Sequence, residues 1–426
     1  MTFIRNYVDY LKYETEYDGR AKVNAQVMEA ARPPHVPADR QVDFDIYNPC
    51  TLEADLHQAW MRMRESTPHG IAWTPHNEGH WIALSPELVS AVLSDSTRFS
   101  NRIVLVPKST AGEAYSEFIP LSLDPPRHRP FRKVLDEQLK VGAVNAREGG
   151  IRDLTVSLIE AFLTNKRCNF THEFAEHLPL QVFMKLVDLP LENLPELKHL
   201  ADQFTRPDGS VTPAEATAQF QKYLAPILAD RKGSGRTDLL THIADAKIEG
   251  RDITEDEAVN LAGQAMVGGL DTVVNFMSFA MYTLAGLPEL QAEIARDPGR
   301  IPKLVNELIR RLPIISSGRE VIEDMEVDGV MLAKGEIVIA PTELYALNES
   351  VNACPFDVDL DRAVRKQVTF GAGPHICPGQ FLARLEIKIL LEEWFARIPS
   401  FRLEPGQQIR HLGGVTSGTE SFWLEW

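Results

Sequence analysis

The segment from Thr254 to Gly286 contains no proline, and after its first turn Asp271 is its only charged residue. Thr254 and Glu257 have the spacing of a capping box, which marks the start of a helix. At ~1.5 Å per residue, a helix over the whole segment would be roughly 45 to 50 Å long. The sequence therefore predicts a protein organised around one long, buried helix.

Polar side chains within this segment argue against a membrane span. Asn260, Gln264, Asp271 and Asn275 interrupt its apolar positions, and such residues are unfavourable inside a bilayer. The first twenty residues are charged and tyrosine-rich, without the apolar core of a signal peptide or anchor. We therefore expect no membrane association.

The charge balance and the cysteines exclude further classes. With 60 acidic against 44 basic side chains, the net charge is −16. Phosphate binding requires a basic surface, so we expect no nucleic-acid partner. The four cysteines are widely spaced and show no zinc-site spacing, which indicates a reducing, cytoplasmic location.

No linker, low-complexity tract or repeat divides the chain. We predict a weakly structured lead over residues 1–45 and a single domain over residues 46–426, mainly α-helical with small β-sheets. The runs IAWTP and HWIALS predict a β-hairpin. The β-rich runs after Arg310 predict a second small sheet.

The stretch TFGAGPHICPGQFLAR places Cys377 in a glycine-rich loop directly before a helix-forming run. Free N–H groups at the start of a helix favour a thiolate. Gly371 and Gly373 allow the backbone to approach a flat partner, Phe370 can pack against its face, and Cys377 can bind a metal at its centre. A lone cysteine is more often a small buried hydrophobe, but the full pattern favours a haem iron.

With Gly379 included, the pattern F-x-x-G-x-x-x-C-x-G resembles the haem-ligand loop of the cytochrome P-450 superfamily of haem-thiolate monooxygenases. The resemblance implies a single large helical domain with a long central helix, haem b as cofactor, and Cys377 as the axial ligand of the iron. Phe370, Gly371 and Gly379 are then cofactor-binding residues.

Basic residues are the candidates for binding the haem propionates. Arg132 belongs to the cluster RHRPFR, for which a solvated surface is the alternative interpretation. If haem is bound, Arg132 can pair with a propionate. The resemblance adds Arg319 and His375 as two further propionate partners.

The sequence GGLDT lies in the middle of the central segment. Gly268 and Gly269 each cost about 1 kcal/mol relative to alanine in a helix. Close helix packing with a surface-facing Asp271 is one explanation. The other, which the resemblance implies, is that the glycines leave space for dioxygen while Asp271 and Thr272 act catalytically by delivering protons.

Glu307 and Arg310 stand three residues apart and can form an ion pair on one helix face. Their position before the cysteine loop resembles the third signature of the superfamily, a structural ion-pair cluster. A basic residue of the later loop NACPFDVDLDR normally joins this pair. Our alignment places Asp357 there, so we expect Arg310 to bridge two carboxylates.

Further stretches resemble the bacterial camphor 5-monooxygenase branch, among them GEAY, TRPDGS, VGGLDTVVNF and NACP. This resemblance implies a monomer that is reduced by a 2Fe-2S ferredoxin, itself supplied by an NADH-dependent ferredoxin reductase. It also implies that Asp271 exchanges ion pairs with Lys198 and Arg206 as the proton path opens.

The substrate pocket departs from that branch. An extra residue in AYSEFIP leaves open whether Tyr115, Ser116 or neither faces the pocket, and Leu105, Leu121 and Gln264 replace an expected phenylalanine, threonine and leucine. We therefore expect a small hydrophobic terpenoid, such as camphor, 1,8-cineole or an ionone, hydroxylated at an unactivated C–H bond with O₂. The expected substrate contacts are Leu105, Tyr115, Ser116, Leu121, Gln264, Val267, Gly268, Ile315, Val415 and Thr416.

Two alternatives remain at this point. A hydrogen-peroxide-dependent peroxygenase would not need a ferredoxin, but such relatives usually lack an acid and alcohol pair like Asp271 and Thr272. A non-catalytic haem- or terpenoid-binding protein would consume NADH without forming a product.

Overall fold

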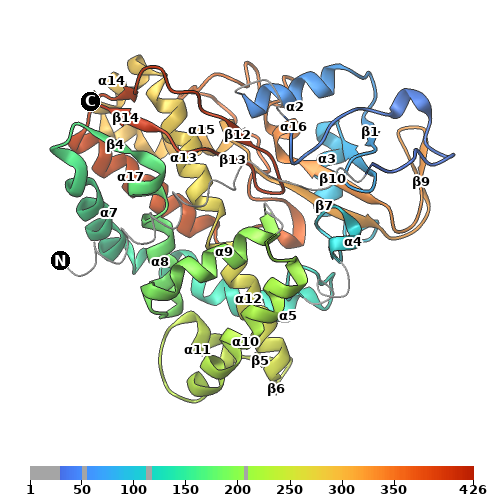
Figure 1. Ribbon diagram of the computed structural model, residues 1–426, viewed down its shortest axis with the longest axis horizontal. Helices are drawn as coiled ribbons and strands as arrows, with labels where there is room; N and C mark the ends of the chain where they lie inside the picture. Colours follow the sequence, from blue (N-terminus) through green and yellow to red (C-terminus); the bar gives the residue numbers. More distant parts are fainter. Residues whose placement is uncertain (1–28, 50–54, 112–117, 206–209) are drawn as a thin grey trace.

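The computed structural model describes residues 29–49, 55–111, 118–205 and 210–426. Helices dominate the regular structure of these residues (Figure 1). In chain order they are α2 (Leu56–Glu65), α3 (Pro86–Ser94), α4 (Lys108–Ala111), α5 (His128–Leu139), α6 (Val141–Asn145), α7 (Glu148–Leu163), α8 (Leu178–Val187), α9 (Leu194–Thr205), α10 (Pro213–Arg231), α11 (Leu239–Ala244), α12 (Glu255–Gly269), α13 (Thr272–Ala285), α14 (Pro288–Arg296), α15 (Ile301–Arg311), α16 (Thr342–Ala346) and α17 (Gln380–Arg397).

The largest sheet has five strands in the order β1-β2-β10-β7-β3. Strands β1 (Ile71–Thr74) and β2 (His80–Ala83) form the expected antiparallel hairpin. Strand β10 (Ile337–Pro341) pairs parallel with β2 and antiparallel with β7 (Ser316–Val321), and β3 (Phe99–Ser100) pairs with the other edge of β7. The sheet lies beside α3 and α16, at the opposite side of the molecule from α7 and α17 (Figure 1).

The expectation of a separate second sheet after Arg310 is wrong for its main strands. Strands β7 and β10 join the first hairpin, and only β8 (Met325–Val327) and β9 (Val330–Leu332) pair with each other alone. All five residues of β10 are buried. A strand that is apolar throughout needs cover on both faces, and the place beside β2 with α3 packed against β10 provides it.

The remaining strands form short ribbons. Strand β14 (Trp423–Glu425) pairs with β11 (Arg402–Leu403) and β4 (Arg167–Asn169), β12 (His411–Leu412) pairs with β13 (Gly418–Thr419), and β5 (Lys247–Ile248) pairs with β6 (Arg251–Asp252). The pairing of β14 with β4 connects the C-terminal residues to the helical body. The prediction of a mainly α-helical protein with small sheets is confirmed.

The predicted central helix is interrupted. Helix α12 ends at Gly269 and α13 begins at Thr272, with Asp271 in a non-helical conformation at φ −136° and ψ −50°. Helices commonly break at glycine pairs. The Asn275 side chain stabilises the break because its Nδ2 donates to the Asp271 carbonyl oxygen at 3.0 Å. The capping box of Thr254 and Glu257 is present as expected.

The buried hydrophobic side chains from Val36 to Leu424 belong to one connected core. Residues 29–45, part of the expected weakly structured lead, carry little regular structure, yet Val36 and Phe44 are buried in that core. The division at residue 45 stays a prediction.

Within the described ranges, no single helix has the length and apolarity to cross a bilayer. Taken together, the stretches Glu255–Ala285 and Pro288–Arg296 are long and apolar enough for a membrane span, but the chain bends by 99° between them.

Candidate functional site

The loop around Cys377 has a backbone that only glycine allows easily. Gly371 has a φ of +78° and Gly373 a φ of +66°, which is the left-handed region. A Cβ at Gly373 would collide with the backbone of Ser94 in α3. The Cys377 N–H donates to the Phe370 carbonyl oxygen at 2.8 Å. These constraints hold the thiol at the start of α17.

Opposing effects act on the Cys377 thiol. Burial raises its pKa, whereas the backbone N–H groups of Gly379 and Gln380 and the charge of Arg132 lower it. In the protein alone the net direction is upward. The N–H groups at the helix start thus favour the thiolate, as expected, but burial outweighs them, and the anion needs a further positive partner such as a metal ion.

Arg319 is a buried cation. Its side chain is 4% exposed, and its Nη1 donates only to the uncharged Ser317 Oγ at 2.7 Å and Gly318 carbonyl at 2.6 Å. Among the described residues its Nε has no hydrogen-bond partner. Burial lowers the pKa of the guanidinium to about 10, although Asp124 acts in the opposite direction. Such a group would be stabilised by an anion.

Two further donors belong to the same neighbourhood. The buried Nε2 of His375 has no partner, and burial together with the charges of His128, Arg319 and Arg132 lowers the pKa of His375 to about 2. The imidazole is therefore neutral and carries one N–H. Arg132 in α5 lies against the same loop, because its Nη1 donates to the Pro374 carbonyl at 3.4 Å.

The donors around Cys377 fit a haem group. A haem has two carboxylates, which Arg132, Arg319 and His375 can bind, and an iron, which a thiolate at Cys377 can ligate. The ring of Phe370 is half-buried beside the loop, with the Arg384 guanidinium 5.0 Å from its centroid. The unmet hydrogen-bonding capacity of Arg319 and His375 is the structural observation that favours this cofactor.

The two glycines of α12 have different surroundings. A Cβ at Gly269 would overlap the ring of Phe183 in α8, so this glycine permits close helix packing. A Cβ at Gly268 would meet nothing within 4 Å. Close helix packing therefore explains Gly269, and the open space lies at Gly268. The use of that space by dioxygen stays a prediction.

Asp271 is buried, which excludes the surface-facing alternative. Its Oδ1 accepts a hydrogen bond from Asn275 Nδ2 at 2.8 Å. Thr272 is the first residue of α13 and is half-buried. The acid and the alcohol thus lie at the interruption of the central helix, next to the open space at Gly268. The partner Asn275 was not predicted, although its place four residues after Asp271 is a signal that helical spacing provides.

The expected ion-pair partners of Asp271 can be placed only in part. Lys198 is buried in α9, where its Nζ lies 2.9 and 2.8 Å from the two carboxylate oxygens of Asp202. Arg206 lies outside the described residues. The exchange of partners stays a prediction.

The Glu307 cluster differs from the expectation. Glu307 and Arg310 are both fully buried and paired, with Arg310 Nη2 at 2.9 Å from Glu307 Oε1. The third basic group is Arg362, whose Nε donates to Oε1 at 2.9 Å, and Arg365 Nε contacts Oε2 at 3.2 Å. Asp357 contributes its backbone carbonyl to Arg310 and its side chain is exposed.

The expectation that Arg310 bridges two carboxylates is therefore wrong. One carboxylate, that of Glu307, instead joins three guanidinium groups. Arg362 is the last residue of the loop NACPFDVDLDR, so an alignment anchored on that arginine would have found it. Arg365 was also missed.

Two segments expected at the pocket do lie together. Ile315 forms an isolated antiparallel bridge with Thr416. Ser316 N donates to the Val415 carbonyl at 2.9 Å, and Ser417 N donates to the Ile314 carbonyl at 2.8 Å. The C-terminal segment thus returns to the start of β7. That the two segments contact the substrate stays a prediction.

The other expected contacts are only partly described. Leu105 is buried, and Leu121, Gln264 and Val267 are half-buried. Tyr115 and Ser116 lie outside the described residues, so their orientation stays open.

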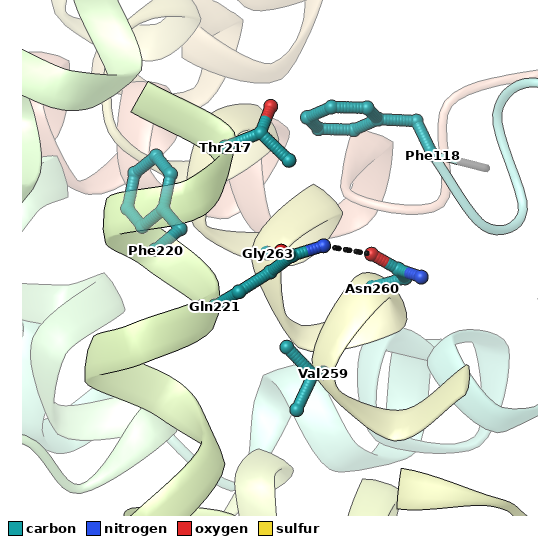
Figure 2. A pocket seen from close by; sticks show the side chains of 7 residues that line it. All are labelled: Phe118, Thr217, Phe220, Gln221, Val259, Asn260 and Gly263. Atoms are coloured by element: carbon teal, nitrogen blue, oxygen red, sulfur yellow. Dashed lines mark hydrogen bonds between the residues drawn. The ribbon is translucent and has the colours of Figure 1, made fainter. Parts of the chain in front are cut away.

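A small cavity lies next to the central helix (Figure 2). Its volume of about 10 Å³ suits about one water molecule. Phe118 lies on one side, Thr217 and Phe220 of α10 on another, and Val259 and Gly263 of α12 below. Gln221 Nε2 donates across it to Asn260 Oδ1 at 3.1 Å. A larger open groove of about 460 Å³ lies around Asp188 and Tyr223 and contains none of the predicted site residues.

Comparisons with known proteins agree with this geometry. Residues 301–411 match the family model described as Cytochrome P450. The chain is 30% identical over 403 residues to "Probable cytochrome P450 127A1" of Sinorhizobium fredii, covering 92% of this chain and 96% of that protein. The structure of CYP101J2 is similar with a TM-score of 0.87 and 48% identity, covering 93% of this chain and 99% of the other. The structure of CYP101C1 has a TM-score of 0.85 and 34% identity, covering 93% and 100%.

Proposed function

Because this chain belongs to the cytochrome P450 family, whose members are haem b monooxygenases with a cysteine thiolate ligand, we propose that it hydroxylates small alicyclic terpenoids with electrons from a 2Fe-2S ferredoxin. The family relationship confirms the resemblance inferred from the cysteine loop, together with the expected fold and cofactor. The substrate class, the ferredoxin with its NADH-dependent reductase, and a cytoplasmic monomer are parts of the proposal.

The observation that carries the site assignment is the set of donors without partners at the cysteine loop. Arg319 is buried with an unused Nε, half-buried His375 has a shielded Nε2 that is unused among the described residues, and Arg132 contacts the same loop. We assign Cys377 as the iron ligand and these three residues to the propionates. Haem supplies the activation of dioxygen.

We assign a separate role at this site to each of the following residues. Cys377 binds the iron as a thiolate, which the N–H groups of Gly379 and Gln380 stabilise. Asp271 and Thr272 hold and move protons at the interruption of the central helix. Gly268 leaves space beside them, while the core around Ala262 and Met266 excludes water from the opposite side of α12.

The terpenoid assignment rests on the sequence resemblance to the camphor 5-monooxygenase branch. It is supported by two CYP101 structures that cover almost the whole chain. The predicted contacts Leu105, Leu121, Val267 and Ile315 are apolar, which suits a hydrophobic substrate.

An optical titration of the purified holoenzyme tests the proposal. We expect a thiolate-type band in the ferrous carbon monoxide spectrum and a high-spin shift of the ferric Soret band with camphor, 1,8-cineole or β-ionone. Cys377→Ala must lose the thiolate band, and Cys354→Ser, a change at an exposed cysteine, must retain it. If the wild type shows no thiolate band when loaded with haem, the assignment of Cys377 is wrong.

Turnover assays distinguish the proposed monooxygenase from a peroxygenase and from a non-catalytic binding protein. With NADH, reductase and a 2Fe-2S ferredoxin, we expect a hydroxylated product. Equal product formation from hydrogen peroxide alone would identify a peroxygenase. NADH consumption without product across a broad terpenoid panel would favour a non-catalytic binder.

A further inference from the structure

Helix α12 carries two side-chain amides one turn apart, and only one has a partner. Asn260 Oδ1 accepts a hydrogen bond from Gln221 Nε2 at 3.1 Å (Figure 2). Gln264, four residues later, has its Oε1 shielded from solvent and without a hydrogen-bond partner. No hydrogen bond of its side chain occurs in the part of the chain that the structure describes.

An unmet buried amide oxygen is unfavourable by about 1–3 kcal/mol. Buried polar groups without a hydrogen-bond partner are rare in natural proteins, and each one needs an explanation. The resemblance to the camphor 5-monooxygenase branch leads us to expect a leucine at this position, so we infer that the fold does not require an amide. A polar group at this position therefore points to a ligand.

The position of Gln264 on the helix supports this interpretation. Residues four apart lie on one face of a helix, so Gln264 lies between Asn260 and Gly268. Gly268 borders open space, and Gly263 lines the cavity shown in Figure 2. Ala262 and Met266, on the opposite side of the helix, are packed in the core. Gln264 does not line that cavity, but it lies on the same side of α12 as Gly268 and the open space there.

That cavity has room for only about one water molecule, so a terpenoid cannot occupy it as it stands. The available polar group for a substrate is then the carboxamide of Gln264 rather than the Asn260–Gln221 pair, which is already satisfied. The atom without a partner is an acceptor, and it requires a donor.

We propose that Gln264 is the specificity-determining residue that accepts a hydrogen bond from a hydroxyl group of the substrate, so the preferred substrates are terpenoid alcohols. This inference rests on the proposed function, because it assumes a terpenoid bound along α12. The preferred functional group of the substrate is then a hydroxyl, in place of the ketone or ether expected from the sequence.

Three ligands with one carbon skeleton test the proposal. Bornane has no oxygen, camphor has a carbonyl that only accepts, and borneol has a hydroxyl that donates. We expect the wild-type holoenzyme to bind borneol about tenfold more tightly than camphor or bornane, the effect of one added hydrogen bond to a buried acceptor. Dissociation constants come from the Soret shift and from calorimetry.

In Gln264→Leu, the preference for borneol should disappear. The matched control is Gln221→Leu, the same substitution at an amide that is already bonded to Asn260, and it should retain the preference. Ligand-free Gln264→Leu should unfold at the same temperature as the wild type or higher, because an unmet polar group is removed. A purely structural Gln264 would show a lower unfolding temperature instead.

The remaining outcomes overturn the proposal in distinct ways. A borneol preference that persists in Gln264→Leu, or no preference in the wild type, excludes Gln264 as the anchor. A camphor preference that disappears in Gln264→Leu shows that the amide donates, and excludes the hydroxyl assignment. If the thiolate band and terpenoid hydroxylation persist in either case, the proposed function stands. If no terpenoid binds, both fail.

Discussion

Gly269 lies so close to Phe183 that a methyl group at residue 269 would overlap the phenylalanine ring. At the preceding Gly268, no atom of another described segment lies within 4 Å of the equivalent position. Two adjacent glycines of one helix therefore have separate purposes. One allows α8 to pack against α12, and the other preserves space at the candidate site.

This difference predicts opposite results for the same substitution. Gly269→Ala should lower the free energy of unfolding by about 1–3 kcal/mol through overpacking. Gly268→Ala should leave stability unchanged or raise it by up to about 1 kcal/mol, since alanine is the better helix former. Only Gly268→Ala should weaken carbon monoxide binding to the reduced holoenzyme at intact stability. Equal loss of stability in both variants would contradict this assignment.

The Glu307 cluster predicts which loop residue stabilises the fold. Arg362→Ala removes a nearly buried guanidinium from Glu307 and should cost about 3 kcal/mol. Asp357→Ala removes an exposed carboxylate and should change the free energy of unfolding by less than about 0.5 kcal/mol. Urea denaturation of the two variants measures both. A larger effect of Asp357→Ala would restore the two-carboxylate arrangement expected from the sequence.

Glu386 predicts a pH dependence of stability. Burial raises the pKa of this carboxyl in α17 to about 8 from the ordinary value of 4.5. Between these values the unfolded chain releases the proton while the folded protein retains it, so stability falls as the pH rises from about 4.5 to 8. Burial also raises the pKa of Glu343 to about 8, so Glu386→Gln should remove only the part of this decline that belongs to Glu386, worth up to about 5 kcal/mol. Denaturant midpoints from pH 5 to pH 8 measure it.

The matched control on the same helix is Glu392→Gln. Burial acts to raise the pKa of Glu392, but hydrogen bonds from Lys388 and Arg152 outweigh it and lower the pKa. Its contribution to stability is therefore present above its ordinary pKa and lost as the pH falls through the lowered value. Glu392→Gln should leave the decline between pH 5 and 8 in place. A decline in Glu386→Gln as large as that of the wild type would show that Glu386 does not contribute to it.

The proline at residue 378, directly after Cys377, predicts a low reduction potential for the haem iron. The N–H groups of Gly379 and Gln380 act on the Cys377 sulfur, whereas Pro378 has no N–H to donate. Pro378→Leu adds a donor, withdraws electron density from the sulfur and should raise the haem potential by roughly 20–60 mV, the equivalent of one modest hydrogen bond. Ile376→Leu, at an exposed neighbour, should leave the potential unchanged in a redox titration. A fall or no change in Pro378→Leu would refute the argument.

Several features could be predicted from short stretches alone. The capping box of Thr254, the hairpin of β1 and β2 and the ion pair of Glu307 with Arg310 depend on residues close together in the chain. The cysteine loop also carries its own geometry, because the glycines at 371 and 373 determine its backbone. Local spacing was a sufficient guide in these cases.

Other features depend on which distant segments meet. The sequence by itself determined the helical class, the haem loop and the acid and alcohol pair of Asp271 and Thr272, because these are set by local spacing. Only the tertiary structure decided that β10 lies beside β2, that Arg362 rather than Asp357 completes the Glu307 cluster, and that Gln264 has no partner while Asn260 does. Pairing, charge neutralisation and burial are properties of contacts between segments far apart in sequence, and local patterns do not specify them.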